Sequence, residues 1–249
     1  MITKNQIKLI NSLKIKKNRQ DHQLFVAEGE KVVNELIQSN FSIKLLFGLK
    51  SWLNDNASLL HANIEFQEVS ELELAKISNL SSPNEVLAVV EIPKMALINK
   101  DDINNKLVLA LDEVKDPGNF GTIIRIADWF SIEYIFCSEQ CVDAFNSKVV
   151  QATMGSLSRV KIIYTNLYEF ISSLDYSYPI YGAVLGGENL YRQDLTKNGL
   201  ILMGNESRGI SPELLKLITN KIEIPRFGNA ESLNVGIATA IFCSEFKRI

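Results

Sequence analysis

The sequence predicts an α/β protein of two domains, the second of them built on a parallel sheet. Short strand-like apolar runs alternate with helical stretches along most of the 249 residues. A segment rich in charges and amides, residues 93–105, interrupts this alternation. We therefore expect a first domain over residues 1–95, a linker over 96–105 and a second domain over 106–249.

Composition indicates an ordinary globular protein, since 46% of the residues are hydrophobic and 22% are charged. The opening residues lack the apolar stretch of a signal peptide, and no window has the length of a membrane span. We therefore expect a cytoplasmic protein with no membrane partner. The three cysteines and the two histidines, His22 and His61, form no ligand cluster. We therefore expect no bound metal. We expect both histidines to be ordinary surface or core residues.

In the first domain we expect a strand at residues 24–27, a helix over 28–38, a strand near 43–48, and, after a further helix, a strand at 85–91. This order is typical of a small α/β domain.

The opening segment is basic and contains no acidic residue. Its charged residues are Lys4, Lys8, Lys14, Lys16, Lys17 and Arg19. Two interpretations stay open. The segment is either an arm that contacts phosphates or a solvated helix face, because Ile7, Ile10, Leu13 and Ile15 recur at helical spacing beneath the lysines.

The second domain contains continuous apolar runs separated by helical stretches, which predicts a parallel sheet covered on both faces. The expected strands are residues 107–111, 134–137, 160–164, 180–185, 200–203 and 222–224. Such sheets bind ligands beyond the carboxyl ends of their strands, so the loops that follow these runs are where chemistry is expected.

The first unusual loop, LDEVKDPGNFGTIIR, spans residues 111–125. Pro117 and Gly118 follow the strand, and Asn119 is expected to cap the helix that begins there. The apolar stripe of that helix leaves Arg125 on another face. Arg125 is either a phosphate ligand near the helix start or part of an ordinary surface ion pair.

Two further loops follow later strands. LMGNESRGISP, residues 202–212, ends a buried strand at a glycine; it is not a phosphate-binding P-loop, and a simple tight turn stays open. IPRFGNAESLNVGIA, residues 224–238, places Ser232 and Asn234 in the first turn of a helix. Ser232 is either a plain helix cap or a functional side chain, whereas Asn234 favours function because asparagine is a poor residue inside a helix.

In this order and spacing, the three motifs together resemble the signature motifs of the SpoU/TrmH family of RNA ribose 2′-O-methyltransferases, within the SPOUT superfamily. The resemblance is close from residue 107 onward and looser before it, where it rests on FVAEG at residues 25–29. It implies an RNA-binding first domain similar in fold to ribosomal proteins. It also implies that the parallel-sheet domain carries a deep trefoil knot.

The resemblance implies S-adenosylmethionine as the cofactor, bound in the knot by backbone groups. The implied contacts fall on Gly204, Ile224 and Leu233, with Met203, Asn205, Ser232 and the strand end at residues 183–185 nearby.

The implied reaction is methyl transfer to a ribose 2′-hydroxyl of structured RNA, ribosomal RNA first and transfer RNA second. Arg125 matches the family's central catalytic arginine. We expect it to orient phosphate and ribose, because a guanidinium is essentially never deprotonated in proteins. Glu206, Ser232 and Asn234 match the other active-site positions, and Asn119 is expected to shape the start of the Arg125 helix.

The resemblance further implies a homodimer formed through the second domain. Two features depart from the family: the acidic pI of about 5.6, and Arg226 and Phe227 where relatives often have a smaller apolar residue after the proline.

Two alternative functions make different demands on the sequence. An RNA-binding or assembly factor without catalysis is disfavoured by four intact residues, Arg125, Glu206, Ser232 and Asn234. A nucleotide-binding oxidoreductase would need a glycine-rich phosphate loop where DPGN stands, at residues 116–119.

Overall fold

The structure is a computed structural model that describes residues 1–60, 64–94, 98 and 100–248. His61, expected at the surface or in the core, lies outside the described residues, whereas His22 is exposed at the end of a helix.

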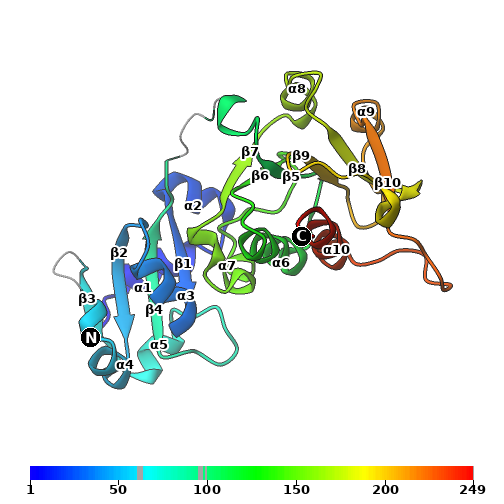
Figure 1. The fold of residues 1–249 in the computed structure, drawn as a ribbon. Helices are drawn as coiled ribbons and strands as arrows, with labels where there is room; N and C mark the ends of the chain where they lie inside the picture. Colours follow the sequence, from blue (N-terminus) through cyan, green and yellow to red (C-terminus); the bar gives the residue numbers. More distant parts are fainter. Residues whose placement is uncertain (61–63, 95–97, 99, 249) are drawn as a thin grey trace. The chain divides into compact units, whose positions relative to one another are not determined.

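The chain forms two compact units, which Figure 1 colours along the sequence. The first unit comprises Met1–Lys94 and Asp143–Ser158, and the second comprises Met95–Val142 and Arg159–Ile249. Compared with the domains expected from the sequence, residues 143–158 pack with the first unit although they follow the start of the second.

The first unit contains a four-stranded sheet in the order β1-β4-β2-β3, in which β4 is antiparallel to both neighbours and β2 is parallel to β3. Its strands are β1 (Leu24–Glu28), β2 (Ile43–Gly48), β3 (Phe66–Glu68) and β4 (Val86–Glu91). Its helices are α1 (Lys4–Ser12), α2 (Lys16–His22), α3 (Glu30–Ile37), α4 (Lys50–Asp55), α5 (Glu71–Ala75) and α7 (Ser147–Thr153), with short 3₁₀ turns at Ala57–Leu59 and Ser156–Ser158.

The opening segment is helical and amphipathic, as the interpretation of a solvated helix face expects, and contact of its lysines with phosphates stays a prediction. Thr3 and Gln6 form a capping box that starts α1. Ile10 and Leu13 are buried in the core of the first unit, whereas the five lysines are exposed. The expectation that Arg19 belongs to a phosphate-contacting arm is wrong.

Arg19 is only 3% exposed, and its guanidinium forms an ion pair with Asp143, with 2.5 Å between Nη2 and Oδ2. Its Nη1 also donates to the carbonyls of Leu13 and Lys14. These bonds tie the end of the opening segment to residues 143–158 within the first unit.

The second unit contains a six-stranded sheet in the order β10-β8-β9-β5-β6-β7, with every neighbouring pair parallel. Its strands are β5 (Leu107–Leu111), β6 (Tyr134–Cys137), β7 (Lys161–Tyr164), β8 (Ile180–Asn189), β9 (Gly199–Met203) and β10 (Asn220–Glu223). Its helices are α6 (Pro117–Trp129), α8 (Leu167–Ser172), α9 (Pro212–Leu215) and α10 (Val235–Phe246), with 3₁₀ turns at Lys100–Asp102 and Leu190–Arg192.

Helices cover both faces of this sheet: α6 and α10 lie side by side on one face, and α8 and α9 lie on the other (Figure 1). Every residue of β5 and β9 is buried for this reason. The central strands β5 and β9 therefore leave no face open to a ligand, and the loops at the strand ends are where a site is expected. Strand order and direction do not define how the C-terminal segment is threaded, and the trefoil knot stays a prediction.

The cysteines are core side chains, since all three are free and buried. Burial raises the pKa of the Cys243 thiol to about 12 and that of Cys137 well above its ordinary value. Within the described ranges, no group of three or more His, Cys, Asp or Glu side chains could hold a metal ion, and no helix is long and apolar enough to cross a membrane.

We predict that Asp143→Ala destabilises the first unit, because it leaves the buried Arg19 charge without its partner. The expected loss is about 3 kcal/mol of unfolding free energy, measured by urea denaturation followed by circular dichroism. Glu91→Ala is the matched control: it removes the exposed Lys44–Glu91 pair, whose atoms are 3.8 Å apart, and should cost less than about 0.5 kcal/mol. Equal losses in the two variants would contradict a structural role for the Arg19 pair.

Candidate active site

The helix α6 begins after β5 with Asp116 as its cap. The Asp116 Oδ1 accepts a hydrogen bond of 2.7 Å from the Asn119 N–H, and Pro117 occupies the first helical position. The expectation that Asn119 caps this helix is therefore wrong. Proline has no N–H to donate and favours that first position, which places the capping carboxylate one residue before it. The Asn119 side chain is thus free for other contacts.

Asn234 is the cap of α10. Its Oδ1 accepts from the N–H groups of Gly236 and Ile237, at 2.9 and 3.3 Å. The placement of Asn234 inside the helix and the interpretation of Ser232 as the cap are both wrong. Ser232 is exposed, and its side chain makes no hydrogen bond to any described residue.

The side chains of three motifs meet in one hydrogen-bonded chain. Asn234 Nδ2 donates to Asn119 Oδ1 at 2.8 Å, and Asn119 Nδ2 donates to Glu206 Oε1 at 3.3 Å. The direction of these bonds is fixed from one end, because the Asn234 oxygen already accepts from the helix and its nitrogen must donate. Glu206 therefore ends the hydrogen-bonded chain as an acceptor, through its Oε1.

The loop that carries Glu206 is braced by Asn205. The Asn205 Nδ2 donates to the Glu113 carbonyl at 2.7 Å, and its Oδ1 accepts from the N–H groups of Ser207 and Arg208. Its backbone forms a bridge with Gly209. Next to it, a Cβ on Gly204 would lie 2.2 Å from the Gly209 carbonyl carbon, so only glycine fits there.

Two acidic residues of the first motif escaped the sequence analysis. Asp116 is the cap described above. Asp112 is buried directly after β5, and its Oδ2 accepts from the Ser211 N–H at 2.7 Å, which links the first loop to the second. Beside it, the Lys115 hydrogen bond and charge lower the pKa of the Glu113 carboxyl. The sequence feature that could have identified Asp112 is its position directly after a buried strand, because a buried carboxylate requires a hydrogen-bonding partner.

Arg125 is exposed on α6 and lies outside the amide–carboxylate chain. It stands one turn after Thr122, whose side chain faces Gly236 at the start of α10. Within the described part of the chain its guanidinium makes no hydrogen bond or ion pair. The ordinary surface ion pair considered from the sequence is therefore absent, and the guanidinium is available to a ligand.

The other expected site residues lie on β8 and β9 or in the segments that follow β9 and β10. Met203 is buried as the last residue of β9, and Ile224 is partly buried just after β10. Leu233 and Leu185 are 50% and 73% exposed, although leucine is usually covered in a folded protein.

The fold and this site together define a class: an α/β enzyme whose reactive groups lie beyond the carboxyl ends of a doubly covered parallel sheet. Residues 106–244 match the SpoU rRNA Methylase family, and residues 4–88 match the MRM3-like substrate binding domain. The chain belongs to the SpoU rRNA methylase family, which confirms the family and the two-domain α/β fold expected from the motifs.

Relatives match along nearly the whole chain. The 23S rRNA (guanosine(2553)-2′-O)-methyltransferase RlmP of Bacillus subtilis is 29% identical over 244 residues, 96% of this chain and 94% of the relative. A solved TrmH-family structure from Porphyromonas gingivalis has 37% identity and a TM-score of 0.89, covering 100% and 99% of the two chains. An AdoMet-bound rRNA methyltransferase from Sinorhizobium meliloti has 31% identity and a TM-score of 0.87, covering 100% and 96%.

We predict that Asn234→Ala lowers the free energy of unfolding of the second unit by about 1 kcal/mol, because α10 loses its cap. Asn234→Asp should keep nearly all of this stability, because a carboxylate also accepts from the helix N–H groups. Ser232→Ala is the control and should change stability by less than about 0.5 kcal/mol. If calorimetry instead finds Ser232→Ala to be the more damaging change, the assignment of the cap is wrong.

Proposed function

We propose that this chain transfers a methyl group from S-adenosylmethionine to a ribose 2′-hydroxyl of structured RNA. Ribosomal RNA is the favoured substrate class and transfer RNA the second. The observation that carries the proposal is the chain from Asn234 through Asn119 to Glu206, which unites the three family motifs. The activities named for the similar RlmP and for the Sinorhizobium enzyme support it.

Exposed apolar side chains among the expected cofactor residues support the cofactor proposal. Leu185 on β8 and Leu233 just before α10 expose apolar surface, which suits an adenine ring. We propose that backbone groups of Gly204, Ile224 and Leu233 hold the cofactor, with Met203, Asn205 and Ser232 nearby. When bound, S-adenosylmethionine supplies an electrophilic methyl group.

The protein's own contribution is to position the ribose and to accept its proton. The free Arg125 guanidinium can pair with a phosphate through two parallel N–H groups and so orient the target nucleotide. Among the three members of the hydrogen-bonded chain, Glu206 alone has a side chain that can take up a proton, so we assign to its carboxylate the proton of the attacking hydroxyl.

The first unit is proposed to supply RNA affinity. Its opening segment exposes five lysines, while Ile10 and Leu13 of the same segment are buried in the core. Phosphate contacts by such lysines give affinity without sequence preference. The working compartment proposed for this activity is the cytoplasm.

A homodimer through α6 and α10 is part of the proposal. These neighbouring helices expose apolar side chains, with Trp129 82% and Ile237 54% accessible. Exposed large apolar side chains on packed helices are typical of an interface between copies of a chain.

We predict that Arg125→Ala folds and binds S-adenosylmethionine normally in calorimetry, yet loses methyl transfer by roughly a hundredfold or more. The assay is transfer of labelled methyl groups to ribosomal RNA purified from cells that lack this gene. Arg125→Lys keeps the charge without the two-pronged geometry and should also fail. Activity restored by lysine and rising toward high pH would point to proton abstraction at this position. Near-normal turnover in Arg125→Ala would contradict the proposed catalytic centre.

We predict that Trp129→Glu converts the dimer to monomers, because a charge cannot be buried unpaired in an apolar interface. Sedimentation velocity measures the change in mass. Tyr176→Glu is the control, since Tyr176 is fully exposed elsewhere in the second unit, at 102%. If Trp129→Glu leaves the mass in solution unchanged, the proposed dimer interface through α6 and α10 is wrong.

A further inference from the structure

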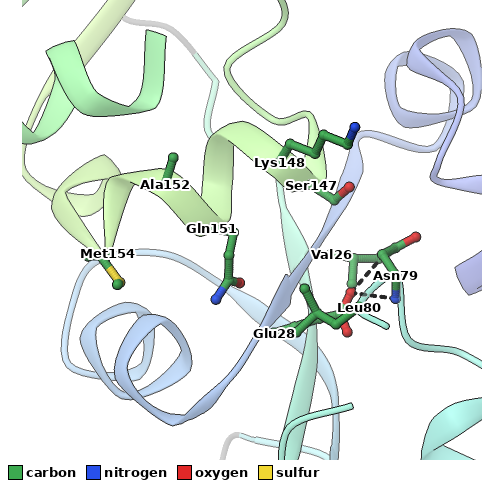
Figure 2. A pocket seen from close by; sticks show the side chains of 9 residues that line it. All are labelled: Val26, Glu28, Asn79, Leu80, Ser147, Lys148, Gln151, Ala152 and Met154. Atoms are coloured by element: carbon green, nitrogen blue, oxygen red, sulfur yellow. Dashed lines mark hydrogen bonds between the residues drawn. The ribbon is translucent and has the colours of Figure 1, made fainter. Parts of the chain in front are cut away.

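The first unit contains a hollow of about 400 Å³ that none of the three motifs reaches. β1, the turn after α5, and α7 with the residues that follow it enclose this space (Figure 2). All the lining residues belong to the first unit. This volume lies within the range of small-ligand sites.

The lining has an apolar part suited to a flat ring. Val26 from β1, Leu80 from the turn and Ala152 from α7 contribute aliphatic groups. Met154 adds a thioether and is 40% exposed. Thioether sulfur makes favourable contacts with aromatic rings, so these side chains fit the face and edge of a heteroaromatic group.

The polar groups of the lining include unused hydrogen-bonding capacity. The Glu28 carboxylate is buried and satisfied, because it accepts from the Ser78 hydroxyl and from the backbone and side-chain N–H groups of Asn79. Its role is to hold Asn79 in place, with the Asn79 oxygen left unbonded among the described residues. The carboxamide of Gln151 extends from α7 into the hollow and bonds no described side chain or backbone group (Figure 2).

The rim carries a positive charge. Lys148 is exposed on α7, and its ammonium forms no ion pair within the described chain. An unpaired lysine beside a recess with free amide donors and acceptors matches a nucleotide: the ring enters the recess and the phosphate stays outside. Amide groups of asparagine and glutamine are well suited to the hydrogen-bonding edges of bases.

We propose that this hollow receives one unstacked nucleobase of the RNA substrate, with the flanking phosphate on Lys148. This inference rests on the proposed function, because it assumes that the first unit binds RNA. It adds a specific site: a base recognised away from the methylated nucleotide and apart from the exposed lysines of the opening helices. Sequence-specific RNA recognition commonly uses bases splayed out of loops in this way.

Filling the hollow tests the proposal in the full-length protein. Ala152→Phe should raise the KM for 23S ribosomal RNA, purified from cells lacking this gene, by roughly tenfold, because the base loses its recess. The turnover number and the affinity for S-adenosylmethionine should stay unchanged. Ala75→Phe is the matched control: it makes the same change at an exposed alanine at the end of α5, outside the hollow, and should leave KM unaltered.

A second variant, Gln151→Ala, tests the same hollow if Ala152→Phe does not fold. It removes the free carboxamide and should raise KM several-fold, while Lys50→Ala, at an exposed lysine outside the hollow, should not. Ultraviolet crosslinking of 4-thiouridine-substituted 23S RNA should label the peptide that contains Gln151. An unchanged KM in Ala152→Phe and Gln151→Ala, or an equal rise in the controls, would overturn the proposal. If the parent protein methylates no RNA, the proposed function fails, and filter binding of the same RNA still decides whether the hollow takes part.

Discussion

The three motif loops of the second unit depend on one chain of hydrogen bonds, from the start of α10 through Asn119 to Glu206. The capping bonds of Asn234 fix its direction, because an oxygen that accepts from two helix N–H groups leaves only the amide nitrogen to donate. The start of α10 thereby orients the Asn119 amide that donates to the Glu206 carboxylate in another loop. If the Asn119 amide were rotated by half a turn, its nitrogen would face the Asn234 nitrogen and its oxygen would face the Glu206 carboxylate, so both hydrogen bonds would be lost.

The remainder of the second unit holds the ends of this chain in place. The central strands β5 and β9 are buried on both faces, so their ends are rigid positions from which the loops start. Asp112 links the first loop to the second, and Asn205 ties the Glu206 loop to the Glu113 carbonyl. Arg125 and Ser232 are the exceptions, because their side chains bond no residue within the described part of the chain and stay available to a ligand.

Much of this could be predicted from sequence, because β5 and β6 are continuous apolar runs whose limits match the structure to the residue. The motifs also indicated that Asn119, Glu206 and Asn234 belong to one site. The helix caps could not be assigned in the same way. Several nearby polar residues, such as Asp116 and Asn119, could each cap α6, and the backbone conformation determines which of them does. Arg19 looked like a surface cation because its partner Asp143 is 124 residues away, and no local pattern reports a contact at that separation.

Mapping ribose 2′-O-methylation on ribosomal and transfer RNA, in cells with and without this gene, tests the central claim most directly. The account predicts that one ribose methyl group disappears from ribosomal RNA when the gene is deleted, that the parent gene restores it, and that a gene encoding Arg125→Ala does not. An unchanged set of 2′-O-methyl groups, or the loss of a base methyl group instead, would contradict it.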